Sequence, residues 1–286
     1  MKKAPTDSIR MPRTMKPFTQ LFVAITASVA LASCSGTRTV TADAGRPEAS
    51  AMVSQQNVNA TLYQNASAEV AWLYEQGYAL ARIKLDANLA LPDTLPPAVI
   101  VDVDETVLDN SPYELENILA GRNYTDSTWK AWTARASAKP LPGALGFLSY
   151  AASRGCSVFY ITNRDASEKG VTITNLAQAG FPMADSAHVL TMSGTSDKTE
   201  RRTAVRRDHR VVLLVGDQLT DYEQVLKDRS VGLGIPTMYT LAEPMSRYFI
   251  LLPNSTYGYW RDGITGRGTD AEKLERVRAF IQQRTR

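Results

Sequence analysis

Histidine and cysteine are scarce in this chain of 286 residues, which contains two of each. His188 and His209 lack the spacing of metal ligands, so the sequence excludes a zinc site built on imidazoles. We expect no disulfide between Cys34 and Cys156, because Cys34 lies in a processing segment and Cys156 starts an apolar strand. The P-loop, the dinucleotide-binding glycine pattern and the nucleophile elbow are also missing. Their absence excludes the usual NTPase, NAD-binding and serine-hydrolase sites.

An excess of charge of one sign is missing as well, because 32 basic residues are balanced by 29 acidic ones. The densest basic group consists of Arg201, Arg202, Arg206, Arg207 and Arg210. Aromatic residues that could stack on bases do not alternate with these arginines, so we interpret the group as a solvated helix face. A nucleic-acid polymer is therefore not predicted as a partner.

Long apolar runs are absent except for Leu21–Ala32, which is too short to span a bilayer comfortably as a mature helix. Basic residues precede this run, so residues 1–33 are predicted to be a signal peptide. The run ends in Leu-Ala-Ser-Cys, which resembles the lipobox of bacterial lipoproteins. That resemblance implies cleavage before Cys34 and attachment of lipid to its thiol, and Ser35 after it points to the outer membrane. An ordinary secretory signal is the alternative.

The mature chain is predicted to begin with a flexible tether and to continue as one α/β domain over residues 57–286. Residues 34–56 are small and polar, which is typical of a linker. Five apolar strands then alternate with helices, so we expect a Rossmann-like parallel sheet in a core of about 97–110 and 143–260. Helical additions are expected at residues 57–92, 111–142 and 261–286. They form a smaller, mainly helical domain from the N-terminal helices and an insert after the first strand.

Two stretches inside the helical additions are informative. Asn59–Leu89 has apolar residues at helical spacing, although Gly77 in its middle weakens the prediction of a single helix. Trp129 and Trp132 are three residues apart and share a face of a predicted helix. Core packing is the favoured interpretation of this pair, and contact with substrate or with a second copy is the alternative.

Polar and charged residues follow each strand of the predicted sheet. Asp102 and Asp104 follow Ala98–Val101, Thr162 ends the second strand, and Lys198 follows the third. Asp217 and Asp221 follow the fourth strand. The carboxyl ends of parallel strands form one edge of the sheet, where ligands bind in such folds, so we expect these residues to gather there.

These residue types suit phosphoryl transfer. Asp102 could attack a phosphorus atom, and Asp104 could protonate the leaving oxygen and then activate water. Lys198 is a positive charge suited to phosphate and to the attacking carboxylate. Oxygen-only ligands such as Asp217 and Asp221 favour Mg²⁺ over zinc.

The ordered set resembles the haloacid dehalogenase (HAD) superfamily, and more narrowly the class C nonspecific acid phosphatases. The resemblance is carried by D-V-D-E-T at Asp102–Thr106, by the strand end Thr162-Asn163-Arg164, by Lys198 and by G-D-Q-L-T-D at Gly216–Asp221. It also includes the segment that runs from Leu252 to Trp260. The likeness covers roughly residues 59–260.

The resemblance implies roles for individual residues. Asp102 would be the nucleophile and Asp104 the general acid and base. The substrate would be bound by Thr162, Asn163, Lys198 and Tyr257, with Tyr257 at the position where nucleotidase members stack a base. Mg²⁺ would be held by Asp102, the carbonyl group of Asp104, Asp217 and, in support, Asp221. Gln218 departs from the usual Asn or Thr beside the metal, and Lys169 is a weaker candidate for the role of Lys198.

The sequence thus predicts a lipid-anchored Mg²⁺-dependent acid phosphatase that forms an aspartyl-phosphate, with 5′-nucleotidase activity as a narrower possibility. The substrate would be a small phosphomonoester, and a homodimer is suggested by the resemblance. One alternative is a non-catalytic surface lipoprotein that binds nucleotides or a protein partner. Another is a phosphotransferase that passes the phosphoryl group to an alcohol.

Overall fold

The structure is a computed structural model that describes residues 48–285, all of which belong to one compact unit. The predicted signal peptide, the lipid site at Cys34 and the first part of the tether lie outside the described residues. Among the residues that are described, no helix is both long enough and apolar enough to cross a membrane.

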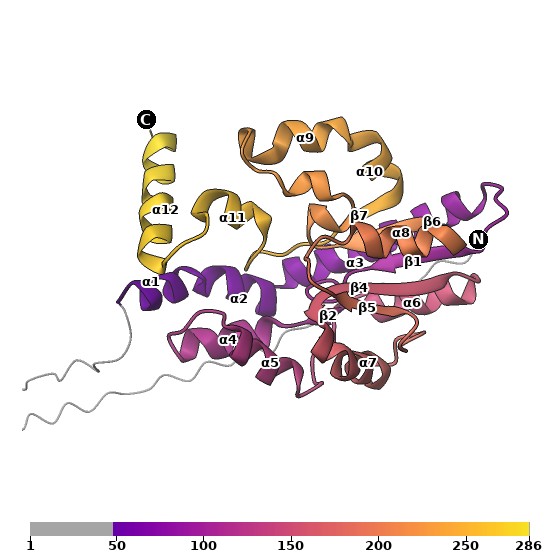
Figure 1. The fold of residues 1–286 in the computed structure, drawn as a ribbon, viewed down its shortest axis with the longest axis horizontal. Helices are drawn as coiled ribbons and strands as arrows, with labels where there is room; N and C mark the ends of the chain where they lie inside the picture. Colours follow the sequence, from indigo (N-terminus) through magenta and orange to yellow (C-terminus); the bar gives the residue numbers. More distant parts are fainter. Residues whose placement is uncertain (1–47, 286) are drawn as a thin grey trace, which may run out of the picture. The chain divides into compact units, whose positions relative to one another are not determined.

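A parallel sheet of five strands forms the centre, in the order β5-β4-β1-β6-β7 (Figure 1). The strands are β1 (Pro97–Val101), β4 (Ser157–Asp165), β5 (Val189–Met192), β6 (Arg210–Gly216) and β7 (Phe249–Leu251). Each of the five lies within a few residues of a strand expected from an apolar, β-branched run. The predicted α/β architecture is confirmed.

Side chains of β1 alternate between the two faces of the sheet, as a strand requires. Val99 and Val101 belong to one apolar cluster, and Ala98 and Ile100 belong to the other. The first face packs against α3 (Ala68–Leu89), α6 (Ala144–Ser153) and α7 (Lys169–Gln178). The second face packs against α8 (Thr199–Asp208), α9 (Ile235–Thr240) and α10 (Ala242–Tyr248). The central strand is therefore buried on both faces, and this fixes the position of the residues that follow it.

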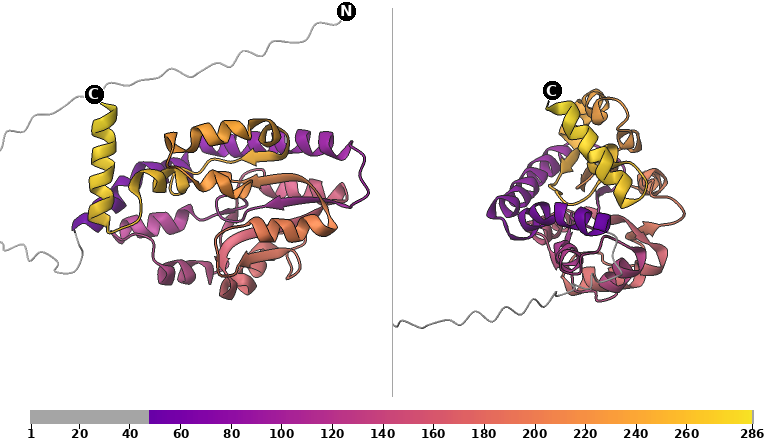
Figure 2. Two further views of the ribbon diagram at one scale, coloured as in Figure 1. Left: turned by 45° about the horizontal axis from the view of Figure 1, so that its top comes forward. Right: turned by 90° about the vertical axis from the view of Figure 1, so that its left-hand side faces the viewer.

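Further helices extend the sheet domain at the end where Asp102 lies. They are α1 (Glu48–Gln56), α2 (Val58–Ala66), α4 (Ser111–Leu119), α5 (Asp126–Thr133), α11 (Tyr259–Thr265) and α12 (Asp270–Arg284). Helix α2 packs on α4, and α12 contacts both α1 and α11 (Figures 1 and 2). Two short antiparallel strands, β2 (Leu108–Asp109) and β3 (Lys139–Pro140), close the insert that carries α4 and α5.

The structure corrects the predicted end of the tether. Residues 34–56 were expected to be flexible, but Glu48–Gln56 form helix α1, which packs against α12. The buried side chains of Val53 and Ser54 lie on this helix. The segment has few apolar residues, so its sequence did not indicate a helix. The helix packs against α12, which is more than two hundred residues away, and a local pattern cannot predict such a contact.

The helix expected at Asn59–Leu89 is divided into α2 and α3 at Ser67. The Ser67 hydroxyl accepts a hydrogen bond from the backbone N–H of Val70 at 3.0 Å, which caps α3. Gly77 does not interrupt α3. A Cβ atom at this position would lie 2.6 Å from Cδ2 of buried Leu252, so glycine permits the close approach of α3 to the segment after β7.

Candidate active site

The chain turns sharply as it leaves β1. The backbone N–H of Asp102 still bonds to the carbonyl of Val215, but the N–H groups of Val107 and Leu108 both bond to the carbonyl of Val103 at 2.9 Å. This tight loop places Glu105 in the left-handed region with a φ of 56°. Non-glycine residues adopt that conformation at a cost, and such strain concentrates at functional sites.

Three carboxylates gather at the carboxyl edge of the sheet. Asp102, Asp217 and Asp221 are buried, and each offers an oxygen within 4.8 Å of the others. The ammonium of Lys198 bonds to Oδ1 of Asp102 and lies 2.7 Å from Oδ1 of Asp221. One positive charge therefore faces three negative ones, which leaves a strong preference for a cation at this point.

The electrostatics of this cluster follow from burial. Burial raises the pKa of the Asp102 carboxyl well above its usual range, and the charge of Lys198 opposes that shift. Burial, followed by the charge of Asp221, raises the pKa of Asp217 to about 7. Burial opposes the charged form of Lys198, but its pairing with Asp102 and Asp221 raises the pKa of the ammonium above its usual value.

Two amide side chains hold Asp217. Its Oδ2 accepts hydrogen bonds from Nδ2 of Asn254 at 2.7 Å and from Nε2 of Gln218 at 2.8 Å, which leaves Oδ1 without a bond from the described residues. Oε1 of Gln218 in turn accepts from the backbone N–H of Tyr259 at 3.2 Å. Gln218 therefore orients Asp217 and connects it to the segment that carries Tyr257.

Gly216 lies directly beneath Asp221. A Cβ atom at residue 216 would lie 2.2 to 2.5 Å from Oδ2, Cβ and Cγ of Asp221. Because the clash includes the Cβ atom of Asp221, rotation of its side chain cannot relieve it, and the backbone of the loop must move. Only glycine lets Asp221 approach Lys198 as observed.

We expect Gly216→Ala to lower the free energy of unfolding by about 1–3 kcal/mol, as overpacked sites do, and to displace Asp221 from Lys198. Unfolding in urea measures the stability. Gly146→Ala is the matched control, because nothing lies within 4 Å of a Cβ at this position in α6 and alanine favours a helix by up to about 1 kcal/mol. Equal stability of the Gly216→Ala variant and the wild type would contradict the proposed contact.

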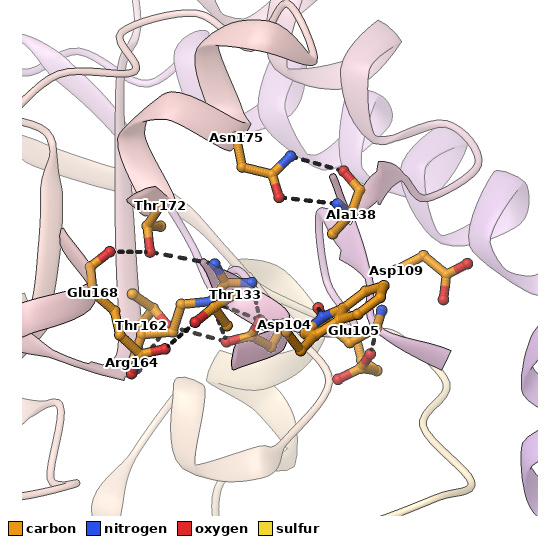
Figure 3. Close-up of polar contacts among 12 residues, drawn as sticks. Asp104, Glu105, Asp109, Thr133, Ala138, Thr162, Arg164, Glu168, Thr172 and Asn175 are labelled. Carbon is orange, nitrogen blue, oxygen red and sulfur yellow. Dashed lines mark hydrogen bonds and ion pairs between the residues drawn. The ribbon is translucent and has the colours of Figure 1, made fainter. Parts of the chain in front are cut away.

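Asp104 points away from this cluster, toward β4. Its Oδ1 accepts a hydrogen bond from Nη2 of Arg164 at 2.7 Å (Figure 3). The same oxygen accepts one from Nδ2 of Asn110 at 2.8 Å. The hydroxyl of Thr162 lies 3.3 Å from Oδ2 of Asp104. The side chain of Asp104 is thus fixed by partners from two segments, β4 and the residue before α4, and only its backbone carbonyl remains for the metal role that the resemblance implies.

A cavity of about 320 Å³ opens above these groups. Both Asp102 and Asp104 line it, as do Lys198, Asp217 and Asp221. Four aromatic residues also line it, namely Tyr124, Trp129, Tyr257 and Tyr259. The cavity therefore combines charged and aromatic side chains, which suits a phosphate ester that has a flat leaving group.

The structure places the predicted binding residues at different depths. Asn163 lines the cavity, and its Oδ1 accepts a hydrogen bond from Arg201 at 2.7 Å. Thr162 is fully buried beside Asp104 and is not part of the cavity lining. The rival candidate Lys169 instead donates to the carbonyl of Ser186 at 2.9 Å, away from the acids. Lys198 is the lysine that reaches the carboxylate cluster.

Tyr257 lines the cavity, and a buried side chain holds it in place. Its hydroxyl donates to Oε2 of Glu105. The backbone of Glu105 is held in turn by Tyr74 of α3, whose hydroxyl lies 2.8 Å from the carbonyl oxygens of Glu105 and Pro253. The N-terminal helices therefore support both the loop after β1 and the segment that carries Tyr257.

The sequence did not indicate a role for several residues of the site. Arg164 belongs to the Thr162-Asn163-Arg164 motif, but no function was predicted for it, although it contacts Asp104 directly. The expected solvated arginine face is wrong for Arg202, which is buried, with Nη1 donating to the carbonyl of Thr220 at 3.0 Å. Arg201 donates to the carbonyl of Thr162 and to Asn163. Only the position of α8 after Lys198 could have indicated that these arginines face the site.

The comparisons agree with this geometry. Residues 19–260 match the sequence profile of the family described as HAD superfamily, subfamily IIIB (acid phosphatase). The chain belongs to this family. The class C acid phosphatase from Bacillus anthracis is a similar solved structure, with 34% identity and a TM-score of 0.76. That match covers 79% of this chain and 97% of the other. A second structure of that protein, with tungstate bound, has 33% identity and a TM-score of 0.75.

Two plant proteins are similar over a smaller part of the chain. Acid phosphatase 1 of Solanum lycopersicum is 32% identical over half of this chain, and the match covers 58% of that protein. A stem 28 kDa glycoprotein of Glycine max is 25% identical over 61% of this chain and 68% of its own length. The chain thus spans little more than half of the tomato protein that it matches.

Proposed function

We propose that this acid phosphatase family member is a metal-dependent phosphomonoesterase that acts through an aspartyl-phosphate on Asp102. The observation that carries the proposal is the pairing of Asp102 with Lys198 in a cavity that also exposes Asp104. A carboxylate whose charge is balanced by an ammonium beside a second carboxylate has the parts needed for nucleophilic attack and proton transfer.

In the first step, a carboxylate oxygen of Asp102 forms a bond to phosphorus while the bond from phosphorus to the leaving oxygen breaks. Asp104 gives a proton to that oxygen, so the leaving group departs as a neutral alcohol. In the second step, Asp104 takes a proton from water as the water attacks phosphorus. The bond to Asp102 then breaks and releases inorganic phosphate, while Lys198 holds its place beside Asp102.

The carboxylate cluster fits Mg²⁺ as the cofactor. Asp102, Asp217 and Asp221 supply only oxygen ligands, and their excess negative charge calls for a divalent ion. When bound, Mg²⁺ would offset the negative charge of the phosphoryl group. Asn254 and Gln218 would keep Asp217 turned toward the ion.

The aromatic residues of the cavity support phosphomonoesters with flat leaving groups as preferred substrates, with nucleoside 5′-monophosphates as an example. Tyr257 and Trp129 line the same cavity as the nucleophile. Tungstate is a tetrahedral oxyanion like phosphate, and its presence in the Bacillus anthracis relative supports an oxyanion site on this fold. We also propose, from the sequence alone, that Cys34 anchors the protein to the outer membrane.

Phosphate release by the purified protein tests the proposal, with p-nitrophenyl phosphate and a panel of nucleoside monophosphates as substrates at acidic to neutral pH. We expect Mg²⁺-dependent release from both classes. An added alcohol acceptor that yields a new phosphomonoester would instead identify a phosphotransferase. Absence of turnover by folded protein in every condition would favour the non-catalytic lipoprotein that binds nucleotides or a protein partner.

A further inference from the structure

We propose that helix α5 fixes the carboxylate of Asp104 through two chains of contacts, one from Trp132 through Asn110 and one from Trp129 through Arg164 of β4. Trp132 and Arg164 are then positioning residues for proton transfer to the leaving group. This inference rests on the proposed function, because it assigns a role within the same reaction. It also assigns Trp129 and Trp132 a role in orienting Asp104, in addition to core packing.

The first contact runs from Trp132 through Asn110. The indole Nε1 of Trp132 donates to Oδ1 of Asn110 at 2.8 Å, and Nδ2 of Asn110 donates to Oδ1 of Asp104 at 2.8 Å. An indole N–H can only donate, so the carbonyl oxygen of the Asn110 amide must face Trp132. The NH₂ group of that amide is therefore turned toward Asp104. Trp132 thus decides which way the Asn110 side chain is oriented.

The second contact runs from Trp129 through Arg164. The guanidinium carbon of Arg164 lies 5.7 Å from the centroid of the Trp129 ring. Nη2 and Nε of the same guanidinium lie 2.7 and 3.0 Å from Oδ1 of Asp104. The side chain of Arg164 is only 1% exposed, and its Nη1 lies 3.3 Å from the hydroxyl of Thr172. Arg164 is therefore held in one orientation between α5, α7 and the loop after β1.

Helix α5 is itself fixed against the core. The hydroxyl of Thr133 donates to Oε1 of Glu168 at 2.6 Å, and the Asn175 side chain makes two hydrogen bonds with the backbone of Ala138 (Figure 3). Thr133 is the last residue of α5, and Ala138 lies five residues after it. A change in the position of α5 would thus reach Asp104 through Asn110 and Arg164 together.

The donors are distributed unequally over the two oxygens of Asp104. Oδ1 accepts the three shortest contacts, from Nη2 and Nε of Arg164 and from Asn110. Oδ2 has only the longer contacts at 3.2 and 3.3 Å, from Nε of Arg164 and from Thr162. The side chain of Asp104 is 15% exposed and lines the cavity. Because Oδ2 makes the longer contacts, we assign to it the exchange of a proton with the leaving group, and the positioning residues hold it in place.

Dependence on the leaving group tests the proposal. The nitrophenolate group leaves without a proton, whereas an alkoxide must be protonated as it leaves, so general acid catalysis matters mainly for alkyl esters. We expect Trp132→Phe, which keeps an aromatic ring but removes the N–H donor, to lower kcat/KM for β-glycerol phosphate by about tenfold or more. For p-nitrophenyl phosphate we expect a change of less than about threefold. The full-length protein is assayed with saturating Mg²⁺.

Three further variants complete the experiment. Arg164→Lys keeps the charge but loses the planar fork, and it should show the same split between substrates. Asp104→Asn should show the largest split, and equal losses there would remove the general acid role itself. Trp72→Phe is the matched control, because Trp72 is exposed on α3, and both rates should be unchanged.

The outcomes distinguish failure of the proposed function from failure of the positioning role. A wild-type protein without activity on either ester would overturn the proposed function. With an active wild type and a split in Asp104→Asn, equal losses on both esters for Trp132→Phe and Arg164→Lys would reduce these residues to a packing role. Unchanged rates for both variants would equally overturn the positioning role.

Discussion

Replacing Asp102 with asparagine is expected to abolish phosphate release, with a loss of at least about 10⁴-fold in kcat. The amide has nearly the shape of the carboxylate, but it cannot form the acyl phosphate that the proposed reaction requires. The loss should be of similar size for aryl and alkyl esters, because both must pass through the same covalent step. Measurement of phosphate release from p-nitrophenyl phosphate and β-glycerol phosphate checks this expectation.

Asp109→Asn is the matched control for this substitution. Asp109 lies seven residues further along the chain, in β2, and is not part of the cavity lining. It accepts a hydrogen bond from the backbone N–H of Ser111 at 2.9 Å. Asparagine can accept that bond as well, so this variant should retain wild-type activity. If Asp102→Asn kept a substantial fraction of the wild-type turnover, Asp102 could not be the nucleophile.

Removal of divalent metal should have the second largest effect. We expect EDTA to reduce phosphate release to roughly the level of the Asp102→Asn variant, and added Mg²⁺ to restore it, because the ion offsets negative charge at the reacting phosphoryl group. Mg²⁺ should also stabilise the folded protein, by about 2.7 kcal/mol when its concentration is 100 times its Kd. Thermal unfolding with and without Mg²⁺ measures this second effect independently of activity.

Asp217→Asn tests whether the carboxylate cluster binds the metal. The substitution removes one negative charge from the cluster of three, so the concentration of Mg²⁺ that gives half of the thermal stabilisation should rise by at least about tenfold. Glu114→Gln is a useful control, because Glu114 lines the same cavity but lies outside the carboxylate cluster. Full activity of metal-free, folded protein would contradict a metal-dependent mechanism.

The sequence predicted the centre of the fold well because the centre depends on local pattern. Each strand of the sheet is a short apolar run, and β1 is followed at once by Asp102 and Asp104. Since parallel strands present their carboxyl ends at one edge, position along the chain was enough to bring Lys198 and Asp217 to the same site. Lys198 was preferred to Lys169 because Lys169 lies on a helix that was expected to point away from the site.

The residues that were missed depend on contacts between distant segments. Arg164 meets Asp104 across 60 residues, and no spacing rule connects the two. Arg202 is buried on a helix whose sequence is otherwise strongly charged, so composition alone suggested a solvated face. Helices α9 and α10 are short and pack on the second face of the sheet, and such helices take their stability from tertiary contacts.

Helix α1 changes how far an anchored copy of this protein could extend from a membrane. If Cys34 carries a lipid, as proposed, the packed part of the chain begins no later than Glu48 and not at residue 57, because α1 packs against α12. The 14 steps from residue 34 to residue 48 span at most about 50 Å when fully extended, compared with about 80 Å for the 22 steps to residue 56. The cavity would then be confined to a thin layer beside the bilayer. Its supply of phosphate esters would depend on the density of anchored copies and on diffusion within that layer.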